Sequence, residues 1–272
     1  MHIQRGAWAE INLDAVAHNV QMAKANLKPT TKLCAVVKAD AYGHGAVRVA
    51  QEAARNGADF FAVALLQEGV KLREAGIETP ILVLGSMLPE VAEICVRYDI
   101  SHAVFDEERL YALNAAALKL HTKAKIHIKI DTGMHRIGVH VRDAGRFAKL
   151  AASLPGIYIE GVFSHFATAD ADDKQYAAYQ FERFQEALRL IEAEGVHIPI
   201  RHIANSAALT ELQEYQLDMV RQGITLYGLH PAHMIDCYKD FEPVMTVKTQ
   251  VAFVKTLPPG ETIGYGRTYK MT

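Results

Sequence analysis

Short apolar segments alternate along the chain with longer amphipathic ones, and this alternation predicts an α/β fold. Eight segments rich in apolar and β-branched residues are predicted as strands: 33–37, 60–65, 81–84, 102–105, 126–131, 158–165, 200–205 and a closely spaced pair within 217–228. Between them, apolar residues recur at helical spacing, most clearly over 46–57, 65–76, 107–120 and 173–195. Several of these stretches end in a glycine, as helices commonly do.

The number of strand–helix units favours a closed barrel. Apolar strands separated by helices indicate a parallel sheet that helices cover, and eight such units match a (β/α)8 TIM barrel. A doubly wound open sheet is the alternative. The sequence therefore predicts one large α/β barrel over most of the chain.

The pattern changes near Phe241, where apolar and polar residues begin to alternate around a Pro-Pro-Gly turn without helical spacing. We assign residues 1–240 to the barrel and residues 241–272 to the start of a C-terminal β-domain. Two or three strands are too few to bury a face of their own. We therefore expect either a truncated chain or another surface that completes the domain.

Composition excludes several classes of partner and site. The 272 residues carry a net charge of −2, which predicts neither nucleic-acid nor membrane binding. The basic segment 119–129 is interpreted as a solvated face or strand edge. The amino terminus lacks a secretory signal, so we expect a cytoplasmic protein. Three widely spaced cysteines are interpreted as ordinary thiols, and the HPAH segment at 230–233 as a loop and not a metal site.

Polar residues follow several predicted strands, and in a parallel barrel the carboxyl ends of the strands meet at one rim. They are Lys38, Arg136, His165, Asn205 with Ser206, and Arg221 with Gly223. A single lysine at a strand end is more often a solvent-facing residue. Surrounded by apolar residues, however, its charged form is disfavoured and the free amine becomes a nucleophile or base, as Schiff-base chemistry requires.

A phosphate site is predicted in the loops after the last two strands. The segments 205–207 (NSA) and 222–224 (QGI) follow strands seven and eight, where barrels commonly bind phosphate. Ser206 could instead be a helix N-cap, and Tyr42 among its glycines could belong to an ordinary loop. Together with a reactive lysine, a phosphate site points to pyridoxal phosphate as the cofactor.

Six segments resemble the successive signature segments of the alanine racemases in order and spacing. They are AVVKADAYGHG, KIDTGMHRIG, SHFATAD, HIANSAA, MVRQGITLYG and IGYGRTY, and they extend over essentially the whole chain. The resemblance implies a pyridoxal-phosphate-dependent isomerase that interconverts L-alanine and D-alanine for peptidoglycan precursors. It also implies a homodimer whose subunits share their active sites.

The resemblance implies two catalytic bases, one on each face of the substrate. Lys38 would carry the cofactor and act as one base, and Tyr265 of the other subunit would act as the second. His165 and Arg221 would provide the environment that a tyrosyl base needs, because the phenol has a pKa of about 10 in water. Arg221 would also bind the pyridine nitrogen, which must then accept a hydrogen bond.

Further residues match positions that bind cofactor or substrate in the family. Arg136 would bind the substrate carboxylate, and Lys129 aligns with a lysine that some members carry as a carbamate. The implied phosphate ligands are Tyr42, Ser206, Gly223 and Ile224, with Asn205 close by.

Two other functions stay open at this point: a noncatalytic pyridoxal-phosphate carrier on the same barrel, and a racemase for another amino acid such as serine. Tyr265 favours an enzyme, because a carrier needs no second base. Alanine racemases continue with more β-domain than this chain contains. We therefore expect little racemase activity from this stretch alone.

Overall fold

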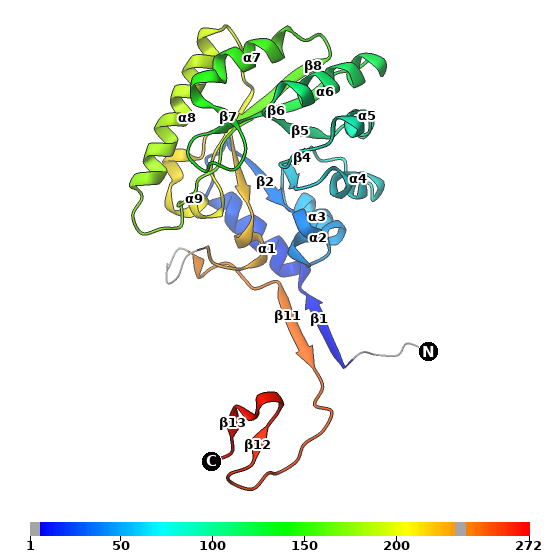
Figure 1. The fold of residues 1–272 in the computed structure, drawn as a ribbon, viewed down its shortest axis with the longest axis vertical. Coiled ribbons are helices and arrows are strands. Elements are labelled where there is room, and N and C mark those ends of the chain that lie inside the picture. The colour runs from blue at the N-terminus through cyan, green and yellow to red at the C-terminus, as the bar shows by residue number, and fades with distance from the viewer. Residues whose placement is uncertain (1–5, 232–237) are drawn as a thin grey trace. The chain divides into compact units, whose positions relative to one another are not determined.

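The computed structural model describes residues 6–231 and 238–272, and its main feature is a ring of parallel strands (Figure 1). Eight of the described strands follow one another in the order β10-β2-β3-β4-β5-β6-β8-β9. Their bounds are β2 Lys32–Val36, β3 Phe60–Val63, β4 Ile81–Val83, β5 Ser101–Val104, β6 Ala124–Asp131, β8 Ile157–Phe163, β9 Ile200–His202 and β10 Met219–Gln222. The short strand β7 (Val139–His140) pairs with the end of β6.

Backbone hydrogen bonds between the first and last members of this order bring the ring to closure. The Asp218 N–H donates to the Arg201 carbonyl, and the Arg221 N–H donates to the Ala204 carbonyl, each at 3.1 Å. These bonds connect the segments of β9 and β10. The predicted (β/α)8 TIM barrel is confirmed, and the open doubly wound sheet is not what the chain forms.

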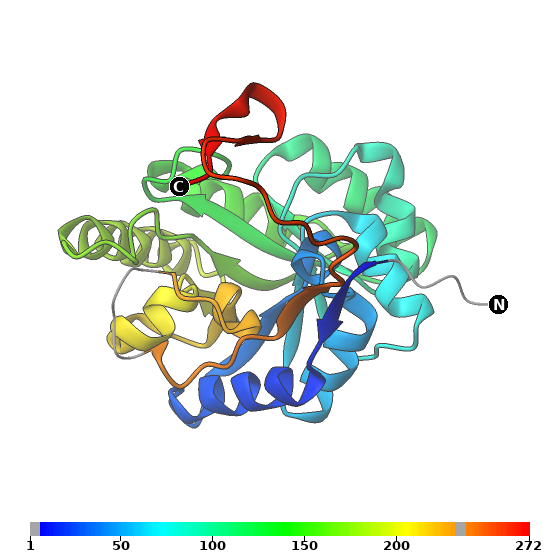
Figure 2. The same ribbon diagram turned by 90° about the horizontal axis from the view of Figure 1, so that it is seen from below.

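Helices lie on the outside of the ring of strands, as both views of the fold show (Figure 2). Their bounds are α1 Leu13–Ala25, α2 Lys38–Tyr42, α3 Ala46–Arg55, α4 Leu66–Glu74, α5 Ala92–Arg97, α6 Glu107–Lys119, α7 Ala144–Ser153, α8 Gln175–Ala193 and α9 Ser206–Glu211. Helix α3 buries Ala46, Val49, Ala50 and Ala53, the i, i+3, i+4, i+7 spacing of one helical face. No helix among the described residues is long and apolar enough to span a membrane.

Two predictions about local structure are wrong. Residues 224–227 form a 3-10 helix and not a strand, because the chain leaves the barrel at Gly223, whose backbone dihedrals fit neither helix nor strand. The basic segment 119–129 is not a solvated edge throughout. His127 and Lys129 are 0% and 4% exposed, since β6 is a central strand and both residues lie on its inner face.

The described chain divides into two compact units. One is Asn12–Val244, which contains the barrel, and the other combines the described residues up to Ile11 with Met245–Thr272. In the second unit β1 (Ala7–Ile11) pairs antiparallel with β11 (Met245–Thr249), and β12 (Thr262–Ile263) pairs with β13 (Tyr269–Lys270). The N-terminal strand therefore belongs with the C-terminal strands and not with the barrel.

Replacing Gly228 with alanine should destabilise the barrel unit strongly. Gly228 has φ +70°, and a Cβ there would lie 1.9 Å from the Glu242 carbonyl oxygen. We expect a loss of about 3 kcal/mol or more in the free energy of unfolding, measured by denaturant titration. Gly195→Ala is the matched control, since Gly195 has φ +75° but open space around it, and should cost only about 1 kcal/mol. Equal losses in both variants would show that the contact with Glu242 does not matter.

Candidate active site

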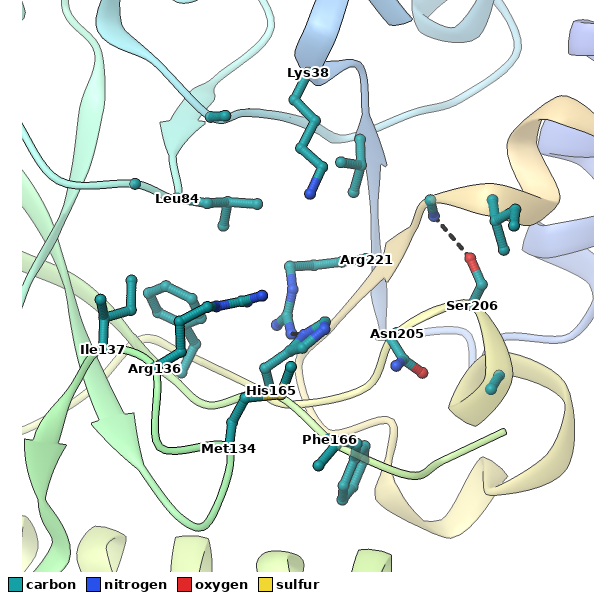
Figure 3. A pocket seen from close by; sticks show the side chains of 18 of the residues that line it. Lys38, Leu84, Met134, Arg136, Ile137, His165, Phe166, Asn205, Ser206 and Arg221 are labelled. Atoms are coloured by element: carbon teal, nitrogen blue, oxygen red, sulfur yellow. Dashed lines mark hydrogen bonds between the residues drawn. The ribbon is translucent and has the colours of Figure 1, made fainter. Parts of the chain in front are cut away.

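A cavity of about 590 Å³ lies at the carboxyl ends of the barrel strands, within the size range of small-molecule sites (Figure 3). Its polar lining comes from strands β6 and β10 and from the loops after β2, β4, β6, β8 and β9. The structure thus brings together residues that lie far apart in the sequence. Those predicted for the site that line this cavity are Lys38, Tyr42, Lys129, Arg136, His165, Asn205, Ser206, Arg221, Gly223 and Ile224.

Lys38 lies two residues after the end of β2 and extends its side chain into the cavity, where its Nζ faces Arg221 (Figure 3). The preceding Val37 N–H still donates to the Ala62 carbonyl of the sheet, which fixes the backbone there. Burial lowers the pKa of the Lys38 ammonium, the positive charges of Arg136 and Arg221 lower it further, and Glu68 opposes the change. The amine is therefore more available as a nucleophile than an exposed lysine is.

A left-handed turn follows Lys38. Residues Ala39 to Tyr42 all have φ between 51° and 56°, a conformation that costs L-residues about 1–2 kcal/mol each. The Glu68 carboxylate stabilises this turn by accepting the Ala39 N–H at 2.6 Å, together with the N–H groups of Ala64 and Leu65. Sequence reasoning missed Glu68, because an acidic residue in the first turn of a helix is common and carries no sign of this contact.

The turn places the Tyr42 hydroxyl beside the loop after β10. A Cβ built on Gly223 would lie 3.7 Å from both the Tyr42 hydroxyl and Ser206 Oγ, so three elements converge there. Ser206 Oγ accepts the Gly223 N–H at 2.8 Å, which leaves the serine hydroxyl hydrogen free to donate. The Ile224 N–H has no acceptor among the described residues. These donors suit a phosphate group.

The N-cap of α9 is Asn205 and not Ser206. Asn205 Oδ1 accepts the Ala208 N–H at 3.1 Å, and Asn205 has the extended backbone of a cap residue. Ser206 is the first helical residue, so the alternative interpretation of Ser206 as a cap is wrong. Its hydroxyl therefore points to the loop after β10 instead of capping its own helix.

Arg221 lies at the base of the cavity and is almost fully buried. Its Nη1 donates to His202 Nδ1 at 2.7 Å, and its Nη2 donates to the Ser164 and Ile203 carbonyls and to His165 Nδ1. Its Nε–H has no acceptor among the described residues. Burial lowers the pKa of Arg221 to about 10, so the group still carries its charge at neutral pH.

His165 is neutral and its tautomer is fixed by Arg221. A guanidinium can only donate, so His165 Nδ1 must accept the 2.9 Å hydrogen bond from Arg221 Nη2. The remaining proton of the ring is then on Nε2. Burial and four nearby cationic side chains, Arg221 first among them, hold the pKa of His165 well below its usual value.

Two more cationic residues line the opposite side. The Arg136 guanidinium points toward the centre of the cavity (Figure 3). Lys129 Nζ is buried without a hydrogen-bond partner among the described residues and lies 4.9 Å from the centre of the Phe163 ring. Burial and the charge of Arg221 hold the pKa of Lys129 well below its usual value, which favours its neutral amine form.

Tyr265 is the one predicted catalytic residue that lies outside the barrel unit. It belongs to the second compact unit, in the 3-10 turn Tyr265–Arg267, and its side chain is fully exposed.

Sequence reasoning also missed the apolar wall of the cavity. Leu84, Met134 and Phe166 line it but read as ordinary core residues in the sequence.

Comparisons with known proteins agree on one family. The family model "Alanine racemase, N-terminal domain" matches residues 11–231. The alanine racemase of Desulfovibrio desulfuricans is 46% identical over 97% of this chain and 71% of its own length, and that of Halothermothrix orenii is 45% identical over 98% and 70%. This chain belongs to the alanine racemase family.

Solved alanine racemases have the same fold. The enzyme from Clostridium difficile superposes with a TM-score of 0.93 at 38% identity, covering all of this chain and 72% of the other. The Bacillus anthracis alanine racemase, solved with bound L-Ala-P, gives a TM-score of 0.91 at 36% identity, covering 100% and 71%. The family consists of pyridoxal-phosphate-dependent isomerases, and these matches support an enzyme and not a noncatalytic carrier.

The residues of the cavity fit pyridoxal phosphate. The Lys38 amine, which makes no hydrogen bond to a described residue, can bind an aldehyde covalently, and hydroxyl and backbone donors of Tyr42, Ser206 and Ile224 gather where a phosphate can bind. Arg221 offers a free N–H between them, which suits an acceptor nitrogen. The chain thus has the donor set that the cofactor of the alanine racemase family requires.

The buried histidines should make the protein less stable in mild acid. The folded-state pKa of His102 is lowered to about 4, and those of His165 and His202 are lowered well below the usual value, whereas the unfolded chain takes up these protons near pH 6.5. Stability should therefore fall as pH drops below 6.5, by up to about 1.4 kcal/mol per pH unit for each histidine. Denaturant unfolding at neutral pH and near pH 5 measures this.

The variant His102→Leu provides the matched comparison, because His102 does not line the cavity. This variant should lose part of the pH dependence, since one fewer buried histidine resists protonation. An unfolding free energy that stays constant or rises as pH falls would contradict the interpretation.

Proposed function

We propose that the function of this protein is to interconvert L-alanine and D-alanine with pyridoxal phosphate bound at Lys38, although the 272 residues by themselves are expected to show little of this activity. The observation that carries the proposal is the Lys38 amine, which enters a cavity between the Arg221 guanidinium and the Tyr42–Ser206 donors. When bound, the cofactor withdraws electrons from the substrate Cα and makes its proton acidic. The protein residues then remove a proton from one face and supply one to the other.

Lys38 acts as the base on one face. Burial and two nearby arginines lower the pKa of its ammonium, so the free amine that accepts a proton is more available than in an exposed lysine. The left-handed turn after Lys38 keeps its backbone fixed during this exchange. Glu68 positions the turn through the Ala39 N–H.

Tyr265 acts as the base on the other face and comes from the second subunit of a homodimer. Its full exposure within its own unit supports this role, because the phenol is available to another surface. His165 would donate a hydrogen bond to the Tyr265 hydroxyl oxygen, because the ring carries its proton on Nε2 while Nδ1 is bonded to Arg221. The charge of Arg221 then favours the phenolate form that a base requires.

Arg221 would hold the pyridine nitrogen of the cofactor through a donated hydrogen bond and so favour its unprotonated form. A guanidinium has no proton acceptor, so a nitrogen that bonds to it must itself be the acceptor. This limits how far the cofactor withdraws electrons, which favours rapid return of the proton over side reactions. Arg136 binds the substrate carboxylate, for which its fork of donors is suited.

Lys129 would carry a carbamate, formed when its neutral amine adds to CO2 and releases one proton, and this group would bond Arg136. Burial and the charge of Arg221 lower the pKa of the Lys129 ammonium, which favours the neutral amine that this reaction needs. Its Nζ also has no other hydrogen-bond partner among the described residues. The anionic carbamate would place a negative charge beside two cationic side chains of the cavity.

The proposed enzyme is a cytoplasmic homodimer that supplies D-alanine for peptidoglycan, and exposed apolar side chains support the dimer. Val247, Val251, Phe253 and Val254 of the second unit are 73–80% exposed, and contiguous exposed apolar residues commonly mark protein interfaces. The relatives that this chain matches are named for alanine, so alanine is favoured over serine as the substrate.

Lys38→Ala should abolish covalent attachment of the cofactor. In the full-length protein, the absorbance band of the lysine-bound cofactor near ~420 nm should be lost in this variant, together with racemisation. Lys32→Ala is the matched control, because Lys32 is exposed at the opposite end of the same strand and should leave both unchanged. A band that persists in Lys38→Ala would remove Lys38 from this role.

Tyr265→Phe should impair proton exchange on one face only. Solvent deuterium incorporation, followed separately from L-alanine and from D-alanine, should become strongly unequal between the two enantiomers, because only the face served by Tyr265 loses its base. Tyr269→Phe serves as the control, since Tyr269 is an exposed tyrosine of the same unit. Equal incorporation from both enantiomers in Tyr265→Phe would exclude the two-base scheme.

A further inference from the structure

A row of polar side chains crosses the inside of the barrel from Arg221 to Glu160. Arg221 Nη1 is 2.7 Å from His202 Nδ1, and His202 Nε2 is 2.9 Å from His127 Nδ1. His127 Nε2 is 3.0 Å from Glu160 Oε2, which also accepts the Ser101 hydroxyl. The contacts join strands that are not neighbours, such as β6 with β9, so the row lies within the barrel and not on its surface.

The hydrogen bonds of this row can point in one direction only. Arg221 has no acceptor, so His202 Nδ1 must accept and carries no proton. The proton of His202 is then on Nε2 and is donated to His127 Nδ1. His127 in turn carries its proton on Nε2 and donates it to the Glu160 carboxylate. Both histidines are neutral, and every donor in the row points away from Arg221.

The backbone is shaped to admit this row. The pairing of β6 with β8 shifts between Ile126↔Ile159 and His127↔Gly161, which leaves Glu160 as the extra residue of a bulge. A bulge of this kind redirects a side chain. The neighbouring Gly161 provides the space, because a Cβ there would lie 2.5 Å from His127 Nδ1.

The row connects the positive charge of Arg221 to the carboxylate of Glu160. Among the described residues its guanidinium bonds only carbonyl oxygens and histidine nitrogens, and no carboxylate. The carboxylate nearest along its hydrogen-bond chain is Glu160, two histidines away. Chains of hydrogen bonds that run in one direction polarise one another, so a carboxylate at the end strengthens each bond back to Arg221.

We propose that Glu160 is a remote positioning residue for Arg221, acting through His127 and His202 to fix the orientation of the guanidinium at the base of the cavity. The proposal rests on the role given to Arg221 in the proposed function. Glu160 itself does not line the cavity, so it touches neither substrate nor cofactor. What it contributes is a strong acceptor at the far end of the row.

Nitrogen-15 spectra of the histidine-labelled protein test the row without cofactor or turnover. In the wild type, His127 and His202 should each show a protonated Nε2 and an unprotonated Nδ1 at neutral pH. A proton on Nδ1 of either ring, or on both nitrogens, would overturn the proposal. The result does not depend on whether Lys38 holds the cofactor, so it separates failure of this inference from failure of the proposed function.

A pair of substitutions in the full-length enzyme tests the consequence for Arg221. Glu160→Leu removes the acceptor and should lower kcat/KM by about 10- to 100-fold, as loss of an outer hydrogen-bond partner does in other sites. Glu160→Gln keeps an acceptor oxygen and should restore both the wild-type histidine tautomers and most of the activity. Glu93→Gln is the control, because among the described residues Glu93 bonds only Arg97 and Lys119, at the surface of α5.

The rescue by glutamine decides between positioning and simple packing. If Glu160→Leu keeps the wild-type kcat/KM, Glu160 does not act through the row. The same follows if the kcat/KM of Glu160→Gln is no higher than that of Glu160→Leu. If Glu160→Leu fails to fold, the tautomers of the wild type and of Glu160→Gln still provide the test.

Discussion

The buried guanidinium of Arg221 is the constraint on which the site depends. A cation inside a barrel is costly unless its donors find acceptors, because burial removes the water that would otherwise solvate it, and here the terminal nitrogens Nη1 and Nη2 find them. Here the acceptors are two carbonyl oxygens and two histidines. Each histidine is thereby fixed in one tautomer. A single charge thus sets the protonation of the residues on both sides of it.

The same charge shapes the reactivity of the lysines. Positive charge at Arg221 lowers the pKa values of Lys38 and Lys129 in addition to the effect of burial. A neutral Lys38 can bind an aldehyde and exchange protons, which an ammonium cannot do. Burial, and the repulsion among the cations that gather in this cavity, thus favour the neutral amine forms of both lysines.

Backbone strain occurs directly after Lys38, the residue proposed to bind the cofactor. The residues from Ala39 to Tyr42 adopt left-handed conformations without the help of glycine until Gly43. Such strain persists only where surrounding contacts determine the conformation, and here Glu68 and Asp40 provide them. The turn brings Lys38 and Tyr42 to one cavity although they are only four residues apart. A regular βα loop would not require this arrangement.

The sequence by itself determined the barrel and most of its polar rim, because the periodicity of strands and helices is local and parallel strands place their ends together. It also determined the family, through six segments in fixed order. Only the tertiary structure showed that Asn205 caps α9, that residues 224–227 leave the sheet, and that His127 and Lys129 are buried. It alone revealed the contacts of Glu68 and Glu160, because both join strands or loops distant in sequence, and no local pattern records which side chains meet across a barrel.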